Sequence, residues 1–294
     1  MNVHNVASQP AAPVAENLDA APVGQAAPAA RADNASSIIN KEIIAGFRAW
    51  PVWMSMGWDD VRQRYRRSII GPFWITLSMG VFILVLSIIY SRLFRMELQT
   101  YMPYLAAGII IWGFIAQSTN ESCLAFHESA RIIKQIKLPY SSYILRVVWR
   151  NFIVFLHTII IFIPVAIIFG VAPSLATLYV IPGLVLLCIN QFWVAMMLAV
   201  LSTRYRDMVP IVQTGVQIMM FATPIMWPVS ALSGATWIAD INPLYHLMEL
   251  VRAPILGDAP AVESWLVAIG LAIAGNAATA VLVAAKSRRL VFWL

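Results

Sequence analysis

The chain has little charge and little cysteine for its length. Asp, Glu, Lys and Arg make up 12% of its 294 residues, against about 25% in average soluble domains. Hydrophobic residues make up 60%, so too few charged side chains remain to solvate the surface of a soluble protein. Two cysteines, Cys123 and Cys188, are too few for a disulfide scaffold or a cysteine-based zinc cluster. The composition predicts an all-α polytopic membrane protein, and it argues against a nucleic-acid partner despite the net charge of +6.

The motifs by which many enzymes and pumps are recognised are also missing. The sequence contains no G-x-x-x-x-G-K-[ST] phosphate loop, no G-x-S-x-G elbow and no H-E-x-x-H metal motif. His157 is the one titratable residue of the kind used for ion coupling in an apolar stretch, and we interpret it as hydrogen-bonded to a neighbouring helix. We attribute the pair Asp59-Asp60 to a helix N-terminus instead of a metal site. If the protein moves a solute uphill, another chain must supply the energy, and we expect no metal or cofactor in this one.

Six stretches are long and apolar enough to cross a bilayer, which takes about 20 helical residues. None of them contains any of the 20 basic or 14 acidic residues. The third and fourth are separated by a few residues around Pro173, which predicts a tight hairpin. The predicted spans are residues 69–90, 103–119, 152–172, 175–201, 211–227 and 265–285.

The basic residues predict the orientation of these spans. If both termini and the segments 121–151 and 202–210 face the cytoplasm, 17 of the 20 basic residues lie on that side. Only Arg92, Arg95 and Arg252 remain on the other side. The positive-inside rule therefore predicts that both termini are cytoplasmic.

The region before the first span divides into two parts. Residues 1–35 include 12 Ala and 4 Pro and no apolar run, which predicts a disordered cytoplasmic tail. Residues 36–68 predict two amphipathic helices separated at Pro51. The second has a stripe of large side chains beside a group of arginines, so we expect it to lie in the headgroup region, although a solvated cytoplasmic helix remains the alternative. The stripe is Met54, Trp58, Val61 and Tyr65, and the arginines are Arg62, Arg64, Arg66 and Arg67.

The longest predicted outer loop, residues 228–264, is rich in apolar residues. Pro224 and Pro228 break the end of the fifth span, and Asn242-Pro243 predicts the start of a further helix. We expect short re-entrant helices here, because irregular backbone at membrane depth must be buried in protein or line a wet cavity.

The cytoplasmic segment between the second and third spans predicts one short helix that ends before Pro139. Its charged residues Glu128, Arg131 and Lys134 could receive a partner protein, although a solvated loop helix has the same pattern. The predicted shared face consists of Leu124, Ala125, Glu128, Ile132 and Gln135.

Aromatic residues are grouped in the first two spans. Aromatic rings stack on the apolar faces of sugars, but they also form membrane belts and pack helices together. The candidates are Trp74, Phe82 and Tyr90 in the first span and Tyr104, Trp112 and Phe114 in the second.

Several of these motifs together resemble a known family. The run 64–74, RYRRSIIGPFW, at the start of the first span is similar to the permease subunits of ABC polysaccharide exporters, most closely the O-antigen branch. The order of the further motifs along residues 55–294 agrees: IKLP at 136–139, YRD at 205–207, TPI at 223–225, and Asn242-Pro243 followed by Arg252.

The resemblance implies that residues 69–294 form a six-span permease domain in a bacterial inner membrane. It implies a homodimer that encloses a channel for a lipid-linked polysaccharide, together with two separate ATPase subunits that bind ATP and Mg. Glu128, Arg131 and Lys134 would then couple ATP hydrolysis to transport, and the six aromatic residues would line the channel. The four arginines would guide the substrate's pyrophosphate or anchor the helix among headgroups. The outer gate would be formed by Pro224, Pro228, Asn242 and Pro243.

Two other functions are compatible with the sequence. An ABC exporter of capsule, teichoic acid, another lipid or a drug would have the same general features. An intramembrane enzyme acting on lipid-linked glycans would need an acid–base or metal cluster near a membrane face. The candidate group for such a cluster is Asp240, Glu249, Asp258 and Glu263.

Overall fold

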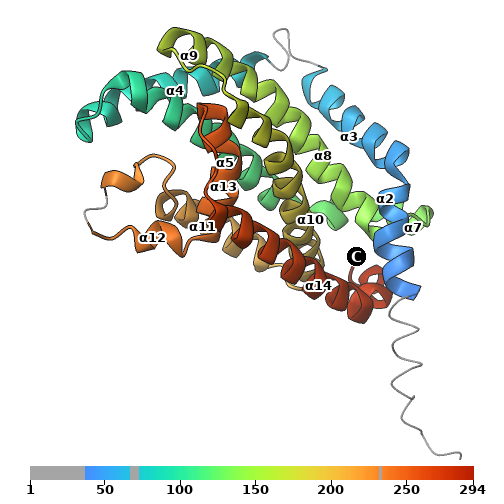
Figure 1. The fold of residues 1–294 in the computed structure, drawn as a ribbon. Coiled ribbons are helices and arrows are strands. Elements are labelled where there is room, and N and C mark those ends of the chain that lie inside the picture. The colour runs from blue at the N-terminus through green and yellow to red at the C-terminus, as the bar shows by residue number, and fades with distance from the viewer. Residues whose placement is uncertain (1–36, 67–72, 232–233) are drawn as a thin grey trace, which may run out of the picture.

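The structure is a computed structural model that describes residues 37–66, 73–231 and 234–294. The described residues form helices and connecting turns, without a β-strand (Figure 1). Arg67 and the predicted tail 1–35 lie outside the described residues. From the N-terminus to the hairpin around Pro173, the helices are η1 (Asn40–Ile44), α2 (Ala45–Arg48), α3 (Trp50–Tyr65), α4 (Phe73–Leu93), α5 (Leu98–Ser122), α6 (Ala125–Glu128), α7 (Ala130–Gln135), α8 (Tyr140–Thr158), η2 (Ile159–Ile161) and α9 (Phe162–Phe169). They are followed by η3 (Leu175–Tyr179), α10 (Val180–Arg204), α11 (Met208–Ala222), η4 (Val229–Ala231), α12 (Trp237–Asp240), α13 (Pro243–Leu256) and α14 (Val262–Trp293).

Five of the described helices are long and apolar enough to cross a membrane. They are Thr76–Leu93, Leu98–Ser122, Tyr140–Phe169, Leu175–Arg204 and Val262–Ser287. The fifth predicted span corresponds to α11, an apolar helix of 15 residues that ends at Ala222, before the prolines. An all-α multi-pass membrane protein is confirmed, whereas the count of six spans stays a prediction.

The predicted bounds of the third span are wrong. Its helix begins at Tyr140, and not near residue 152, because Pro139 is its N-cap. Arg146 and Arg150 therefore lie on the same continuous helix as the apolar residues. The helix can carry these arginines because both form ion pairs with carboxylates of neighbouring helices.

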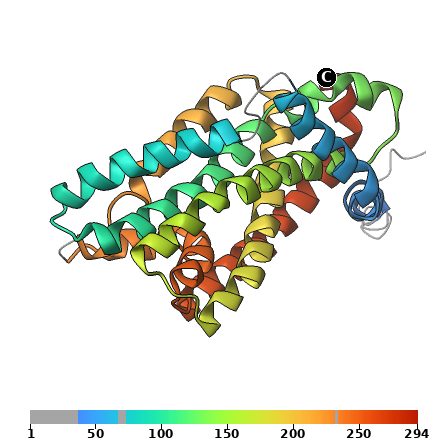
Figure 2. The same ribbon diagram turned by 90° about the horizontal axis from the view of Figure 1, so that it is seen from above.

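Helix α5 lies at the centre of the bundle. It packs against α4, α8, α10, α11 and α13, and most of its residues are buried. Helix α4 lies at the edge of the bundle beside α5, and most of its large apolar side chains are exposed (Figure 2). The core therefore surrounds α5, and the outer face of α4 is left for lipid or protein.

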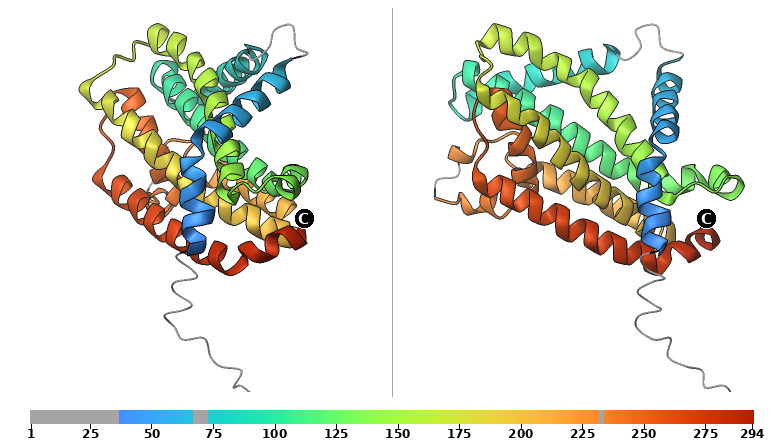
Figure 3. Two further views of the ribbon diagram at one scale, coloured as in Figure 1. Left: turned by 90° about the vertical axis from the view of Figure 1, so that its right-hand side faces the viewer. Right: turned by 45° about the vertical axis from the view of Figure 1, so that its right-hand side comes forward.

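The N-terminal helices lie across the outside of α8 (Figure 3). Helix α3 begins at Trp50 with Pro51 in its first turn, a position that proline tolerates because no backbone N–H is needed there. Gly57 allows close approach, since a Cβ at this position would lie 2.9 Å from the ring of Trp149 on α8. The members of the predicted stripe differ in exposure: Val61 is buried against the bundle, whereas Trp58 is exposed.

The bundle has two ends, which we name after the helices that mark them. The α7 end carries α6, α7 and the C-terminal ends of α10 and α14, and it corresponds to the predicted cytoplasmic side (Figure 1). The α13 end carries α12, α13 and the hairpin between α9 and η3. This hairpin is as predicted: α9 ends at Gly170 in the left-handed conformation, and Ser174 caps η3 while its Oγ donates to the carbonyl of Gly257 over 2.6 Å.

Candidate functional site

Helices α6 and α7 project from the α7 end of the bundle (Figure 3). Ala125 and Phe126 on α6 are buried, and the Phe126 ring meets the ring of Tyr140 edge-on at 5.7 Å. Glu128, Arg131 and Lys134, the residues predicted to couple to an ATPase, are all exposed. The projecting segment therefore presents these three charged side chains while α6 anchors it to the bundle.

The single helix predicted in this segment is wrong. The helix is interrupted at Ser129, between α6 and α7, and both Phe126 and Ser129 are buried. The break also divides the predicted apolar face: Ala125 is buried, whereas Glu128 and Gln135 are exposed. Helix α7 does end before Pro139, as expected.

Five charged side chains from three helices form one connected group, here called the charged cluster. It consists of Asp60 and Arg64 on α3, Glu121 on α5, and Arg146 and Arg150 on α8. Arg146 binds both carboxylate oxygens of Asp60, with Nε–Oδ2 and Nη2–Oδ1 distances of 2.7 and 2.5 Å. Arg150 bridges the two acids, with Nη1 3.2 Å from Asp60 and Nη2 2.7 Å from Glu121.

Glu121 is the most connected member of the charged cluster. Its Oε1 accepts hydrogen bonds from Arg64 and Gln117, and its Oε2 accepts from Arg150 and Asn151, over distances of 2.7 to 3.1 Å. Bidentate and charge-assisted bonds of this kind are roughly twice as strong as neutral ones. The cluster therefore fastens α3 to both α5 and α8.

The charged cluster was not predicted from the sequence, and it corrects the interpretation of Asp59-Asp60. Asp59 and Asp60 lie in the C-terminal half of α3, so a helix N-terminus does not explain them. The one available signal was the i, i+4 spacing of Arg146 and Arg150, which places both on one face of a helix. Their acidic partners are 29 to 90 residues away in the sequence, so no local pattern could identify them.

The N-terminal segment also caps the start of α8. The carboxylate of Glu42 accepts a hydrogen bond from the backbone N–H of Tyr140 at 3.2 Å, and Ser141 Oγ donates to the carbonyl of Ile43. A negative charge is favourable at a helix N-terminus. Burial nevertheless raises the pKa of Glu42 above its ordinary value, and the backbone hydrogen bond offsets this only in part. A Cβ on Gly46 would clash with Ser141, so the two segments fit closely.

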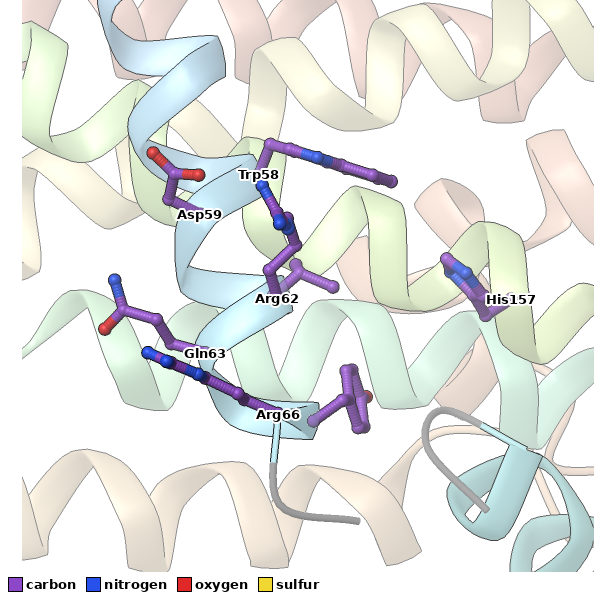
Figure 4. A pocket seen from close by; sticks show the side chains of 8 residues that line it. Trp58, Asp59, Arg62, Gln63, Arg66 and His157 are labelled. Carbon is purple, nitrogen blue, oxygen red and sulfur yellow. The ribbon is translucent and has the colours of Figure 1, made fainter. Parts of the chain in front are cut away.

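The predicted headgroup arginines have separate environments. Arg62 and Arg66 line a cavity of about 770 Å³ between α3 and α8, together with Trp58, Asp59 and His157 (Figure 4). Among the described residues, neither arginine has an ion pair, whereas Arg64 is paired with Glu121. His157 Nδ1 lies 2.8 Å from the carbonyl of Ile153 on its own helix, so the predicted bond to a neighbouring helix is wrong.

At the α13 end, Arg252 is almost fully buried, with 1% exposure. Its Nε donates to Glu249 at 2.9 Å, its Nη1 donates to the carbonyl of Pro224 at 2.6 Å, and its guanidinium lies 4.2 Å from the ring centroid of Tyr104. Burial lowers the pKa of Arg252, but the charge and hydrogen bond of Glu249 together with the neighbouring Tyr104 and Tyr245 raise it overall. The residue counted in the sequence as an outer-loop charge is thus a buried connector between α13, α5 and the end of α11.

Other side chains hold the same turn after α11. The Tyr104 hydroxyl lies 3.0 Å from the carbonyl oxygen of Pro224 and 3.2 Å from that of Trp227, so the two share its one hydrogen, and Tyr101 Oη donates to the carbonyl of Met226. Asn242 caps α13, as predicted, by accepting from the N–H groups of Leu244 and Tyr245, and its Nδ2 donates to Thr223. Of the predicted gate residues, Pro224, Pro228 and Asn242 are buried and Pro243 is exposed.

The six predicted channel aromatics do not share one surface. Trp74 and Phe82 are exposed on α4, and Tyr90 stacks on Phe94 at 5.8 Å. Phe82 and Trp112 line a cavity of about 320 Å³ between α4, α5 and α11. Phe114 is 3% exposed and packs against Phe152 and Phe155 of α8 in the core, so it does not line an open surface of this chain. Tyr104 belongs to the Arg252 contacts.

The outer acidic residues do not form a metal site in the described part of the chain. No three His, Cys, Asp or Glu side chains among the described residues lie close enough together to hold an ion. Glu249 is paired with Arg252, and the Asp240 backbone carbonyl is hydrogen-bonded to His246 Nε2 at 2.7 Å.

Comparison with known proteins shows similarity over most of this architecture. Residues 51–256, from α3 to the end of α13, match the family described as "ABC-2 type transporter". Two proteins of Klebsiella pneumoniae named "O-antigen export system permease protein RfbA" are each 28% identical over 194 residues, covering 64% of this chain and 74% of the relative. A protein of the same name from Myxococcus xanthus is 22% identical over 199 residues, covering 66% and 76%.

Proposed function

Because the chain belongs to the ABC-2 type transporter family as a multi-pass membrane subunit, we propose that it exports a lipid-linked polysaccharide such as O-antigen across the bacterial inner membrane. The observation that carries the proposal is its similarity, over about two thirds of its length, to permeases named for O-antigen export in two organisms. In this role the chain has no ATPase site of its own, and two partner subunits bind ATP and Mg.

The proposed transporter contains two copies of this chain. The exposed apolar face of α4 and the cavity between Phe82 and Trp112 support a second copy at this side of the bundle. Stacking on these rings is weak and needs no charge, so a neutral polymer can slide from one ring to the next. We assign the channel wall to Trp74, Phe82 and Trp112, and we leave Phe114 to the core.

ATP-driven motion would enter through α6 and α7. Closure of the ATPase subunits would push the exposed residues Glu128, Arg131 and Lys134, and the short connection after α7 would pass the push to the start of α8. Arg146 and Arg150 lie about two and three turns into α8, and the charged cluster links them to α3 and α5. Such a connected polar group can move three helices together.

The substrate headgroup would meet the chain at α3. Arg62 and Arg66 border the cavity in Figure 4, and arginine can bind two phosphate oxygens at once. Arg64 is engaged by Glu121, so among the described arginines the proposed phosphate contacts are Arg62 and Arg66. At the other end, the contacts of Arg252 with Glu249 and Pro224 would hold the outer gate closed at rest.

The export function is tested by deleting the gene and measuring polysaccharide on both sides of the membrane. We expect surface polysaccharide to disappear and lipid-linked polymer to accumulate inside the cell, with both effects reversed by the wild-type gene. A deletion strain that keeps normal surface polysaccharide and accumulates no polymer would refute the proposal. Accumulation of a different lipid-linked product would identify another substrate within the same transporter class.

The coupling role is tested with the double variant Glu128→Ala/Arg131→Ala. The purified transporter should still hydrolyse ATP but should lose most polymer export. The matched control, Arg92→Ala/Glu97→Ala, removes one exposed charge of each sign at the opposite end and should export normally. Unchanged export by the first variant would exclude these residues from coupling.

A further inference from the structure

A second basic site lies between the ends of α10 and α14, away from the α3 cavity. It is a cavity of about 250 Å³ lined by Arg204 and Tyr205 at the end of α10 and by Lys286, Arg289 and Trp293 on α14. Among the described helices, α10 and α14 form the most extensively packed pair. The cavity therefore lies between two helices whose relative position is fixed by their packing.

The charged side chains that line this cavity in the described part of the chain are all basic. Its lining includes three basic side chains and no acidic one. Among the described residues, none of Arg204, Lys286 and Arg289 forms an ion pair. Three cations that line one cavity repel each other, and a bound anion would reduce this repulsion.

Two aromatic rings support one of these cations. The guanidinium of Arg204 lies 5.5 Å from the ring centroid of Trp293 and 5.8 Å from that of Tyr205. Such contacts use the flat face of the guanidinium and leave its N–H groups, which lie in the plane, able to donate. Tryptophan and tyrosine are also the residues typical of the membrane–water interface.

We propose that this cavity binds the phosphate of an anionic phospholipid of the cytoplasmic leaflet. Both of its helices are long and apolar enough to span the membrane, and the cavity lies at their ends, where lipid headgroups are found. Basic pockets between membrane-spanning helices on the cytoplasmic side are a known way of binding anionic headgroups. The proposal rests on the predicted orientation of the chain and not on the nature of the exported substrate.

The chemistry of the site distinguishes between lipids. A phosphatidylglycerol headgroup brings one uncompensated negative charge, to which arginine can donate two hydrogen bonds. A phosphatidylcholine headgroup has the same phosphate but adds a quaternary ammonium, which the three cations would repel. The site should therefore prefer phosphatidylglycerol, and the preference should weaken at high salt because screening reduces each attraction.

The test measures lipid binding to the purified full-length chain by native mass spectrometry in a neutral detergent. The variant Lys286→Gln/Arg289→Gln should bind phosphatidylglycerol about 25-fold more weakly, since each basic residue contributes roughly fivefold. Arg204→Gln alone should weaken binding about fivefold. The control Arg131→Gln/Lys134→Gln removes the same charge from exposed positions on α7 and should bind as the wild type does.

Several outcomes would overturn the proposal. One is equal phosphatidylglycerol binding by all variants of unchanged thermal stability, and another is equal binding of phosphatidylcholine by the wild type. Displacement of lipid by inorganic pyrophosphate at equal affinity would indicate a soluble phosphate ligand, and exclusive binding of a polyprenyl pyrophosphate would indicate the substrate. Loss of ATPase co-purification in Lys286→Gln/Arg289→Gln with unchanged lipid binding would indicate a protein contact. Because the binding assay uses the permease alone, its failure would leave the proposed export function unaffected.

Discussion

Replacing Glu121 by Gln removes the charge that joins two arginines of the charged cluster. Arg150, whose side chain is 10% exposed, would keep only its 3.2 Å contact with Asp60, and Arg64 would lose its ion pair. Removing one partner of a buried pair costs about 3–5 kcal/mol, but Glu121 is 20% exposed and Gln can still accept from Asn151. We therefore expect the free energy of unfolding to fall by about 2–4 kcal/mol.

The assay is thermal or denaturant unfolding of the purified chain in detergent, followed by tryptophan fluorescence. A loss of this size should lower the midpoint of thermal unfolding by several degrees. The control is Glu97→Gln, which makes the same chemical change at the other end of α5, where the side chain is exposed and, among the described residues, has no ion pair. Glu97→Gln should unfold within about 0.5 kcal/mol of the wild type.

A double-mutant cycle with Arg150→Gln separates the ion pair from other effects. If Glu121 and Arg150 interact as the 2.7 Å distance indicates, the double variant should be more stable than the sum of the single losses predicts, by about 0.5–3 kcal/mol. Additive losses, or equal losses for Glu121→Gln and Glu97→Gln, would show that the cluster does not fasten α3 to α5 and α8.

Three further predictions concern packing, pH and the outer end. Gly183→Ala should destabilise the chain by about 1–3 kcal/mol in the same unfolding assay, because the new Cβ would clash with the backbone carbonyl of Leu250 on α13. Gly113→Ala, with nothing within 4 Å of the new Cβ, should be tolerated. Burial raises the pKa of Glu42, so the stability that its protonated form contributes is lost as the pH rises through that raised pKa. Glu42→Gln should therefore flatten the pH profile of thermal stability above about pH 4. A profile identical to that of the wild type would contradict this. Arg252→Gln should cost about 2–4 kcal/mol by leaving Glu249 without its partner, and wild-type stability of this variant would contradict the prediction. Arg252→Lys keeps the charge, so wild-type stability of that variant would show that the guanidinium geometry is unimportant.

Much of the secondary structure could be predicted because its signals are local. The apolar stretches identified the long helices, and Pro51, Pro139 and Asn242 each mark a helix boundary in the structure as their chemistry requires. The exact ends were less predictable. Helix α8 begins at Tyr140, whereas the predicted span began at residue 152. The segment between them contains arginines, which a buried helix tolerates only when distant carboxylates pair with them. The residues near these arginines in the sequence do not identify such distant partners.

Some features of the candidate site could likewise be predicted from the sequence, and others could not. Charged side chains are usually exposed, so the sequence alone predicts the exposure of Glu128, Arg131 and Lys134. The arginines at 62, 64, 66 and 67, in contrast, looked equivalent in the sequence, yet Arg64 is paired and Arg62 lines a cavity. Nearby residues of a helix face different neighbours. Phe114 resembled the other aromatic residues until its contacts with α8 placed it in the core.

By itself, the sequence determined that this is a helical membrane protein, since hydrophobicity and charge spacing are properties of the residues alone. Only the tertiary structure decided which charged groups meet: Asp60 with Arg146, Glu121 with Arg150, and Arg252 with the turn after α11. The physical reason is that helix periodicity specifies which face a side chain occupies, whereas the packing of helices distant in sequence determines what that face contacts.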